Sequence, residues 1–129
     1  MILLDTHAWL WLRSEPSKLP EALRVVVSYE GLAVSAVSCF EVATLARLGR
    51  IALDRPTRVW IAQALEAEPR VSAMPITAEI AAVAGDLGAG FPGDPADRLI
   101  YATAAGSGWR IATRDRRIRA FDHSRAIWD

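Results

Sequence analysis

The sequence contains very little cysteine and lysine. Cys39 is the only cysteine and Lys18 the only lysine among 129 residues. A lone cysteine forms no internal disulfide, which excludes a disulfide scaffold. No secretory signature accompanies it, so we expect a reducing, cytoplasmic compartment. Phosphate chemistries that use a lysine late in the fold are disfavoured, because the only lysine comes early.

Long apolar runs and an excess of one charge are also missing. The longest uncharged run, Leu99–Trp109, is too short and too rich in glycine to cross a bilayer. Basic and acidic residues number 15 each, so the chain is not a polycation that coats nucleic acid without selectivity. The first apolar run lacks both a following glycine-rich phosphate loop and the Asp-x-Asp of haloacid-dehalogenase-like phosphatases, since it leads into Asp5-Thr6-His7.

The sequence does have a regular alternation of short apolar runs and helical stretches. Its length predicts one domain over residues 1–129, and 52% hydrophobic residues are enough for a packed core. Strands are predicted at Ile2–Leu4, Leu32–Val34, Val71–Met74, Arg110–Thr113 and Ala126–Trp128. Helices are predicted at Ala8–Leu12, Glu21–Tyr29, Ser38 to just before Gly49, Thr57–Ala67, after a Thr77 cap, Pro95–Ala105 and Asp115–Ala120. The expected fold is α/β, a three-layer sandwich whose central, mostly parallel sheet of about five short strands has helices on both faces.

Four acidic residues are placed to meet at one edge of this sheet. Asp5 and Asp115 directly follow predicted strands, while Glu41 and Asp97 lie in the first turns of predicted helices. Ligands bind outside the carboxyl ends of parallel strands, so these side chains are expected to share one rim. Crowded carboxylates repel one another, and a hard dication removes that repulsion. Oxygen ligands without a histidine or cysteine cluster favour Mg²⁺ or Mn²⁺ over Zn²⁺. Such an ion suits phosphodiester hydrolysis.

The end of the chain supplies positive charge beside these acids. Between residues 110 and 129, six arginines accompany only three aspartates. Carboxylates alone repel a polyanionic substrate, and arginine binds phosphate through planar, paired donors. From this segment we expect Arg114, Arg116 and Arg117 to contact the phosphates of the substrate. Arg98, directly after Asp97, either joins them or only balances the charge of that aspartate.

Four stretches stand in the order and spacing of a known family: LLDTHAWLWL, SAVSCFEVATLARLGRI, DPADRLIYATA and ATRD. Together they resemble the PIN-domain ribonucleases and, more narrowly, the VapC-type toxins of bacterial toxin–antitoxin pairs. The resemblance implies a PIN-like fold and cleavage of RNA that depends on Mg²⁺ or Mn²⁺. It implies that the four acids are the catalytic and metal-binding residues, supported by Thr6 and Thr113. It also implies a VapB-type antitoxin partner and a homodimer.

Each acid also has a purely structural interpretation. Asp5 can cap the helix that follows it, and Ser38 with Glu41 fits the S-x-x-E capping box. Asp94 is interpreted as a helix cap that also supports the site, and Asp115 stands between arginines as in a surface ion pair. If these roles are the whole explanation, the chain is an inactive protein-binding or RNA-binding module. A metal-dependent phosphatase or DNase on a similar sheet is the other alternative.

Cysteine, histidine and tryptophan are interpreted mainly as packing residues. Cys39 is interpreted as a small buried residue, since no histidine is evidently placed to activate it. His7 is interpreted as hydrogen-bonded or buried, although its position close to Asp5 also suits the cleft. Trp9 and Trp11 lie two apart on a short helix and cannot share one face, which leaves one of them free to form an interface.

Overall fold

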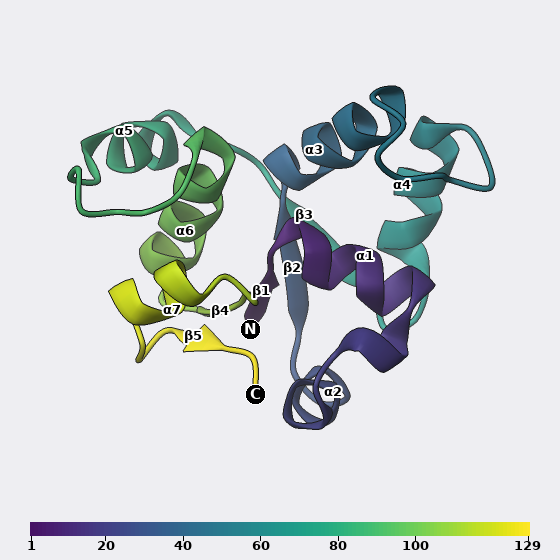
Figure 1. The fold of residues 1–129 in the computed structure, drawn as a ribbon, viewed down its shortest axis with the longest axis horizontal. Helices are drawn as coiled ribbons and strands as arrows, with labels where there is room; N and C mark the ends of the chain where they lie inside the picture. The colour runs from purple at the N-terminus through teal and green to yellow at the C-terminus, as the bar shows by residue number, and fades with distance from the viewer.

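A five-stranded parallel sheet forms the centre of the computed structural model, which describes all 129 residues (Figure 1). The strands are β1 (Ile2–Leu4), β2 (Leu32–Ser35), β3 (Val71–Met74), β4 (Arg110–Ala112) and β5 (Ala126–Ile127). Their order across the sheet is β3-β2-β1-β4-β5, and every neighbouring pair is parallel. The central strand β1 therefore pairs on both sides, with β2 and with β4.

Seven α-helices and one 3₁₀ turn connect these strands. They are α1 (Thr6–Ser14), the 3₁₀ turn Pro16–Lys18, α2 (Glu21–Val27), α3 (Ala36–Arg47), α4 (Thr57–Glu66), α5 (Ala78–Asp86), α6 (Pro95–Ser107) and α7 (Arg116–Phe121). The predicted α/β sandwich with about five short, parallel strands is confirmed. The longest helix has 13 residues, and no helix has the length and apolarity that a bilayer span requires.

The alternation of side chains along the strands builds a core on each face of the sheet. Ile2 and Leu4 of β1 pack into a large cluster with residues of α1, α2, α3 and α4, including Trp9 and Trp60. Leu3, between them, packs on the opposite face with residues that include Ile100 of α6. Because β1 is buried on both faces, its carboxyl end is held firmly at the centre of the sheet edge.

The start of α3 differs from the sequence prediction. Ser35 caps this helix through a 3.1 Å hydrogen bond from the Val37 N–H to its Oγ, so the helix begins at Ala36 rather than at Ser38. The interpretation of Ser38 and Glu41 as a capping box is therefore wrong. Glu41 lies in the second turn of α3, and its carboxylate is free to take part in tertiary contacts.

Candidate active site

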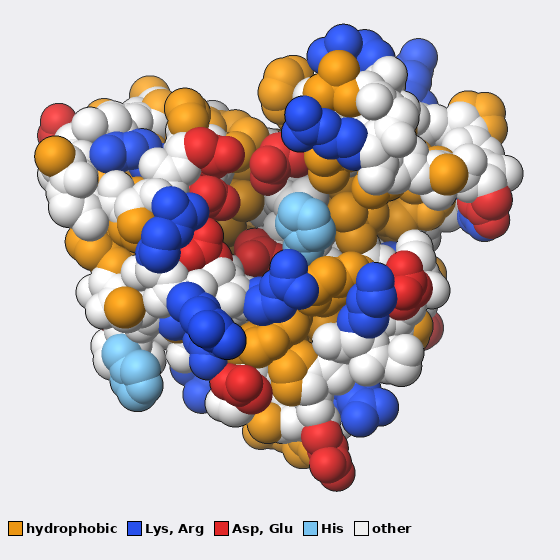
Figure 2. Space-filling model, viewed as in Figure 1, with side chains coloured by type: hydrophobic (Ala, Val, Ile, Leu, Met, Phe, Trp, Pro, Cys, Tyr) orange, Lys and Arg blue, Asp and Glu red, His pale blue; other side chains and the backbone are white.

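All four predicted acids line one pocket at the carboxyl edge of the sheet. Figure 2 shows acidic side chains gathered around a hollow between the two halves of the molecule. The pocket has a volume of about 300 Å³, and its lining residues are Asp5, Thr6, His7, Glu41, Asp94, Asp97, Ile100, Arg114 and Asp115. Five carboxylates thus face one guanidinium in the lining. The four predicted acids therefore lie in the lining of one pocket at the carboxyl edge of the sheet, together with Asp94.

Asp5 is positioned by the central strand and by the helix that follows it. Its backbone N–H continues the pairing with β4 by donating to the Ala112 carbonyl at 3.0 Å. Its carboxylate accepts a 2.8 Å hydrogen bond from the Ala8 N–H and so caps α1. Burial raises the pKa of Asp5, although the hydrogen bonds from Ala8 and Thr113 act to lower it. A buried carboxyl with a raised pKa benefits from a nearby cation.

Glu41 reaches the pocket from α3 and is tied to the first residue of α1. The Thr6 hydroxyl donates a short hydrogen bond to the Glu41 carboxylate and is also hydrogen-bonded to the Ser38 hydroxyl at 2.9 Å. Thr6 and Ser38 are both buried. This contact fixes α3 relative to α1 and holds the Glu41 carboxylate at the pocket.

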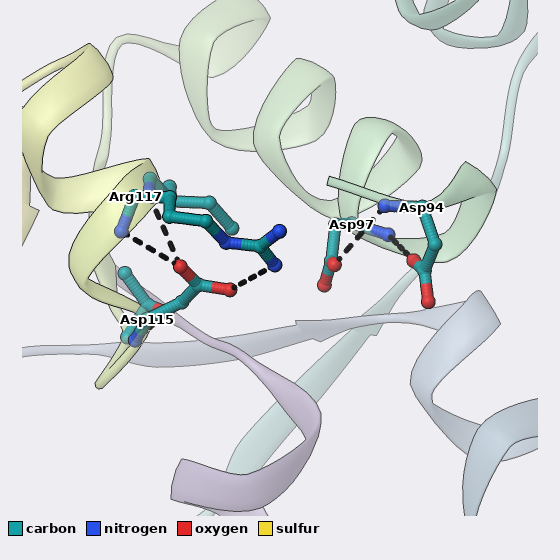
Figure 3. Close-up of polar contacts among 6 residues, drawn as sticks. Asp94, Asp97, Asp115 and Arg117 are labelled. Atoms are coloured by element: carbon teal, nitrogen blue, oxygen red, sulfur yellow. Dashed lines mark hydrogen bonds and ion pairs between the residues drawn. The ribbon is translucent and has the colours of Figure 1, made fainter. Parts of the chain in front are cut away.

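Asp94 and Asp97 enter from the start of α6, where they cap each other's backbone (Figure 3). The Asp97 N–H donates to the Asp94 carboxylate at 2.9 Å, and the Asp94 N–H donates to the Asp97 carboxylate at 3.3 Å. Asp94 is thus the helix cap that the sequence predicts. Burial, followed by the negative charge of Asp94, raises the pKa of Asp97 to about 7, and the charge of Glu41 adds to this effect. Burial and neighbouring negative charge thus both disfavour the ionised form of Asp97.

Asp115 closes the opposite side of the pocket. It caps α7 by accepting from the Arg117 N–H at 2.8 Å, and it pairs with the Arg117 guanidinium at 3.2 Å (Figure 3). Burial acts to raise the pKa of Asp115, but the hydrogen bonds from Arg117 and Ile118 hold it below its ordinary value. The Thr113 hydroxyl accepts from the Asp115 N–H at 3.1 Å and also supports Asp5. Thr113 thereby joins two acids from different segments.

The pocket is suited to a hard divalent cation although it presents no ready-made coordination shell. No three acidic, histidine or cysteine side chains converge on one point, because each carboxylate is turned toward a hydrogen-bond donor of the chain. Mg²⁺ keeps several water ligands and binds through one or two carboxylates, so it does not need such a shell. The predominance of carboxylate oxygens in the lining and the raised pKa values of Asp5 and Asp97 both fit this ion.

The four arginines expected to contact RNA have different surroundings. Arg114 lines the pocket, and Arg117 projects toward the acids from α7. Arg116 is exposed on α7 outside the pocket lining. Arg98 instead donates to the carbonyls of Leu87 and Gly88, at 2.6 and 3.3 Å, and so holds the loop before α6. Its donors are therefore turned to that loop and not to the pocket.

His7 differs from the interpretation favoured by the sequence. It is exposed and lines the acidic pocket, and its side chain makes no hydrogen bond within the chain. Trp9 is fully buried, whereas Trp11 is half-buried, so the two tryptophans separate as expected. The spacing of His7 and Trp11, four residues apart on α1, is the sequence signal that pairs them on one helix face.

Comparisons with known proteins agree with this architecture. Residues 2–124 match the family model described as PIN domain. Ribonuclease VapC22 of Mycobacterium tuberculosis is 45% identical over 127 residues, which cover 98% of this chain and 95% of that protein. The structure of VapBC2 from Rickettsia felis bound to a DNA fragment from their promoter matches with a TM-score of 0.71 at 15% identity, covering 100% of both chains. VapBC-1 from nontypeable Haemophilus influenzae matches with a TM-score of 0.70 at 17% identity, covering 98% of this chain and 97% of that one.

Proposed function

The chain belongs to the PIN-domain family and is of the VapC type, and from this premise and its acidic pocket we propose that it is a Mg²⁺- or Mn²⁺-dependent endoribonuclease. We propose further that it acts as the toxin of a toxin–antitoxin pair. The observation that carries the proposal is the pocket itself, in which carboxylates from four separate segments meet beside Arg114. The 45% identity to a ribonuclease over nearly the whole chain supports RNA as the substrate.

The proposed roles divide the residues in and around the pocket into three groups. Asp5, Glu41, Asp97 and Asp115 would hold the ion directly or through water, with Thr6, Thr113 and Asp94 fixing their positions. When bound, the ion supplies an activated water and stabilises negative charge on the phosphate. Arg114, Arg116 and Arg117 offset the repulsion between the acids and the RNA backbone, and bind its phosphates.

A protein antitoxin is the proposed partner. The matched structures from Rickettsia felis and Haemophilus influenzae are named as VapBC assemblies. In this chain an apolar groove of about 460 Å³ between α3 and α6 adjoins the acidic pocket and shares Glu41 and Asp94 with it. Phe40, which lines this groove, is 70% exposed. A partner that places apolar side chains here and a basic one among the acids would block the active site. The homodimer implied by the family also stays a proposal, which sedimentation analysis tests.

The alternative of an inactive module is favoured by one specific observation. Asp5, Asp94 and Asp115 each cap a helix, so a structural reason exists for every one of them. Capping does not require a fourth acid on α3, however, and Glu41 caps nothing. The concentration of unpaired charge around Asp97 is likewise unfavourable for a merely structural site.

RNA cleavage decides between these functions. We expect the purified protein to cut single-stranded RNA with Mg²⁺ or Mn²⁺ and to stop when EDTA is added. Glu41→Gln keeps an oxygen that accepts from Thr6 but removes the charge, so it should fold normally and lose cleavage. Cleavage by Glu41→Gln at the parent rate would contradict the proposal, as would undiminished activity in EDTA. Parallel assays on single-stranded DNA and a phosphate monoester test the DNase and phosphatase alternatives.

A further inference from the structure

An aromatic surface borders the acidic pocket, and the side chains of Arg114 and Lys18 lie against it. The half-buried ring of Trp11 lies at its centre, with His7 on the pocket side. The His7 and Trp11 rings meet edge to face at 6.0 Å between centroids, and Trp128 packs against Trp11 at 5.8 Å from the other side. We call His7, Trp11 and Arg114 the Trp11 surface. Figure 2 shows a histidine and basic side chains alternating with apolar ones beside the acidic hollow.

Arg114 connects this surface to the pocket. Its guanidinium lies over the Trp11 ring at 4.9 Å from the centroid, and the same side chain lines the acidic pocket. Lys18 lies over the ring at 5.5 Å, but it is also paired with Glu15 at 3.1 Å. Arg114 forms no hydrogen bond or ion pair with the rest of the chain and is exposed. Its five donors are therefore available to a ligand.

Trp11 packs against the core cluster of α1, and that packing accounts for the buried part of its ring but not for the exposed side chains beside it. The buried core beneath α1 is completed by Trp9 and Trp60, which meet edge to face at 5.5 Å. Trp11 leaves part of its surface to solvent, and the exposed His7 imidazole contacts the Trp11 ring but has no hydrogen-bond partner in the chain. A partly exposed aromatic surface beside a guanidinium that has no ion-pair partner is the combination by which proteins hold unpaired nucleotides, through base stacking and a phosphate contact.

We propose that His7, Trp11 and Arg114 form a nucleotide subsite that holds single-stranded RNA beside the acidic pocket. One base stacks on the aromatic side chains, and Arg114 binds a phosphate close to the bond that is cut. The inference rests on the proposed ribonuclease function and deepens it, since it restricts the substrate to RNA with an unstacked base near the cleavage point. Duplex RNA keeps its bases stacked and paired, so it is expected to bind and react poorly.

The test uses RNA binding in an Asp5→Asn background, where cleavage is not expected to interfere. A fluorescein-labelled single-stranded RNA reports affinity by anisotropy, and 2-aminopurine in the same RNA reports stacking by quenching. Trp11→Leu should weaken binding by at least about 5-fold and abolish the quenching, whereas Trp11→Phe should keep both in part. Tyr29→Leu is the matched control, because Tyr29 is 70% exposed beyond the end of α2 and outside the pocket lining.

Arg114 is tested by salt dependence. Arg114→Ala should lower the slope of log affinity against log salt by about 0.7, the value for one phosphate contact on a single strand. Arg110→Ala removes the same charge from the opposite end of β4, where Arg110 is exposed and outside the pocket lining, and it should leave the slope unchanged. If Trp11→Leu unfolds, the RNA affinities of Trp11→Phe, His7→Ala and Arg114→Ala decide whether the subsite exists.

The outcomes separate this inference from the proposed function. Parent-like RNA binding by folded Trp11→Leu and Arg114→Ala would overturn the subsite, even if the wild-type protein cleaves RNA. The same result combined with lost inhibition by an antitoxin would assign the surface to protein binding instead, which also overturns the inference. A wild-type protein that binds RNA through these residues but never cuts it would contradict the ribonuclease proposal and leave the subsite standing.

Discussion

The hydroxyl of Thr6 donates a hydrogen bond to the carboxylate of Glu41, a residue 35 positions further along the chain. This contact joins the start of α1 to the second turn of α3 at the carboxyl edge of the sheet. It holds one acid of the pocket through a buried side chain that carries no charge itself. The geometry of the site therefore depends on neutral residues as well as on the acids.

Removing the Thr6 hydroxyl should impair catalysis more than folding. Thr6→Val keeps the shape but leaves Glu41 and the Ser38 hydroxyl without this partner, and we expect cleavage to fall by about 10-fold or more, as for other residues that orient ligands. Thr6→Ser retains the hydroxyl and serves as the control. Initial rates of RNA cleavage over a Mg²⁺ titration provide the measurement. Equal rates for the Val and Ser variants would show that the hydrogen bond does not orient Glu41.

The absence of a side chain at Gly93 leaves the space that the Asp97 side chain occupies. A Cβ atom at residue 93 would lie 2.5 Å from the Asp97 Cβ and 2.6 Å from a Phe91 ring carbon, so the aspartate would have to move. We expect Gly93→Ala to reduce RNA cleavage by about 10-fold or more, since small misplacements at an active site have large effects. Gly90→Ala adds the same methyl group to the same loop with nothing within 4 Å, and it should cleave RNA normally. Comparable rates for the two alanine variants would contradict this view of the loop.

Asp97 should make the metal-free protein less stable as the pH rises. Its pKa is raised to about 7 in the folded state, from about 3.9 when unfolded. Between these values the folded protein binds more protons, so the free energy of unfolding decreases with increasing pH. In EDTA at pH 7.5, Asp97→Asn should therefore melt higher than the wild type, by about 3 °C. Mg²⁺ should raise the melting temperature of the wild type more at pH 8 than at pH 5. An Asp97→Asn variant that melts lower in EDTA would refute this assignment.

Arg117 should oppose metal binding while it helps to bind RNA. Its guanidinium pairs with Asp115 and points toward the acids across the pocket (Figure 3), but its side chain is 67% exposed. Arg117→Gln should tighten Mg²⁺ binding by only about 2- to 5-fold, because an exposed ion pair contributes little. RNA affinity measured separately should decrease. Isothermal titration gives the first quantity and anisotropy the second, and a change of both in the same direction would rule out this division of roles.

The sequence predicts the fold well because its signals are local. Apolar triplets such as Ile2–Leu4 are too short for helices, and each leads into a helical stretch, which leaves a parallel sheet as the simplest arrangement. Because the carboxyl ends of parallel strands lie at one edge of the sheet, Asp5 and Asp115 are predicted to share that edge from the sequence alone. Asp94 is recognisable as a cap because proline follows it directly.

Other features depended on contacts that local sequence does not encode. Ser35 and Ser38 are both good helix caps. The Val37 N–H donates to Ser35, whereas the Ser38 hydroxyl contacts Thr6, so Ser35 has the capping role. The position of Glu41 followed from the same choice, so its capping role was wrongly predicted. His7 was expected to be packed or hydrogen-bonded. Its exposure follows because the face of α1 that carries Trp9 packs into the core and His7 lies on another face. The sequence of so short a helix does not show which of its faces is buried.

The central claim is that acids from separate segments act on one divalent ion, and calorimetric titration with Mn²⁺ tests it most directly. The wild-type protein should bind Mn²⁺ in the pocket. Asp5→Asn, Glu41→Gln and Asp97→Asn, each on a different segment, should each weaken binding by about 10-fold or more. Asp86→Asn, at an exposed position that ends α5, should bind like the wild type. A wild-type protein that binds no Mn²⁺, or three pocket variants that bind it as well as Asp86→Asn does, would contradict the claim.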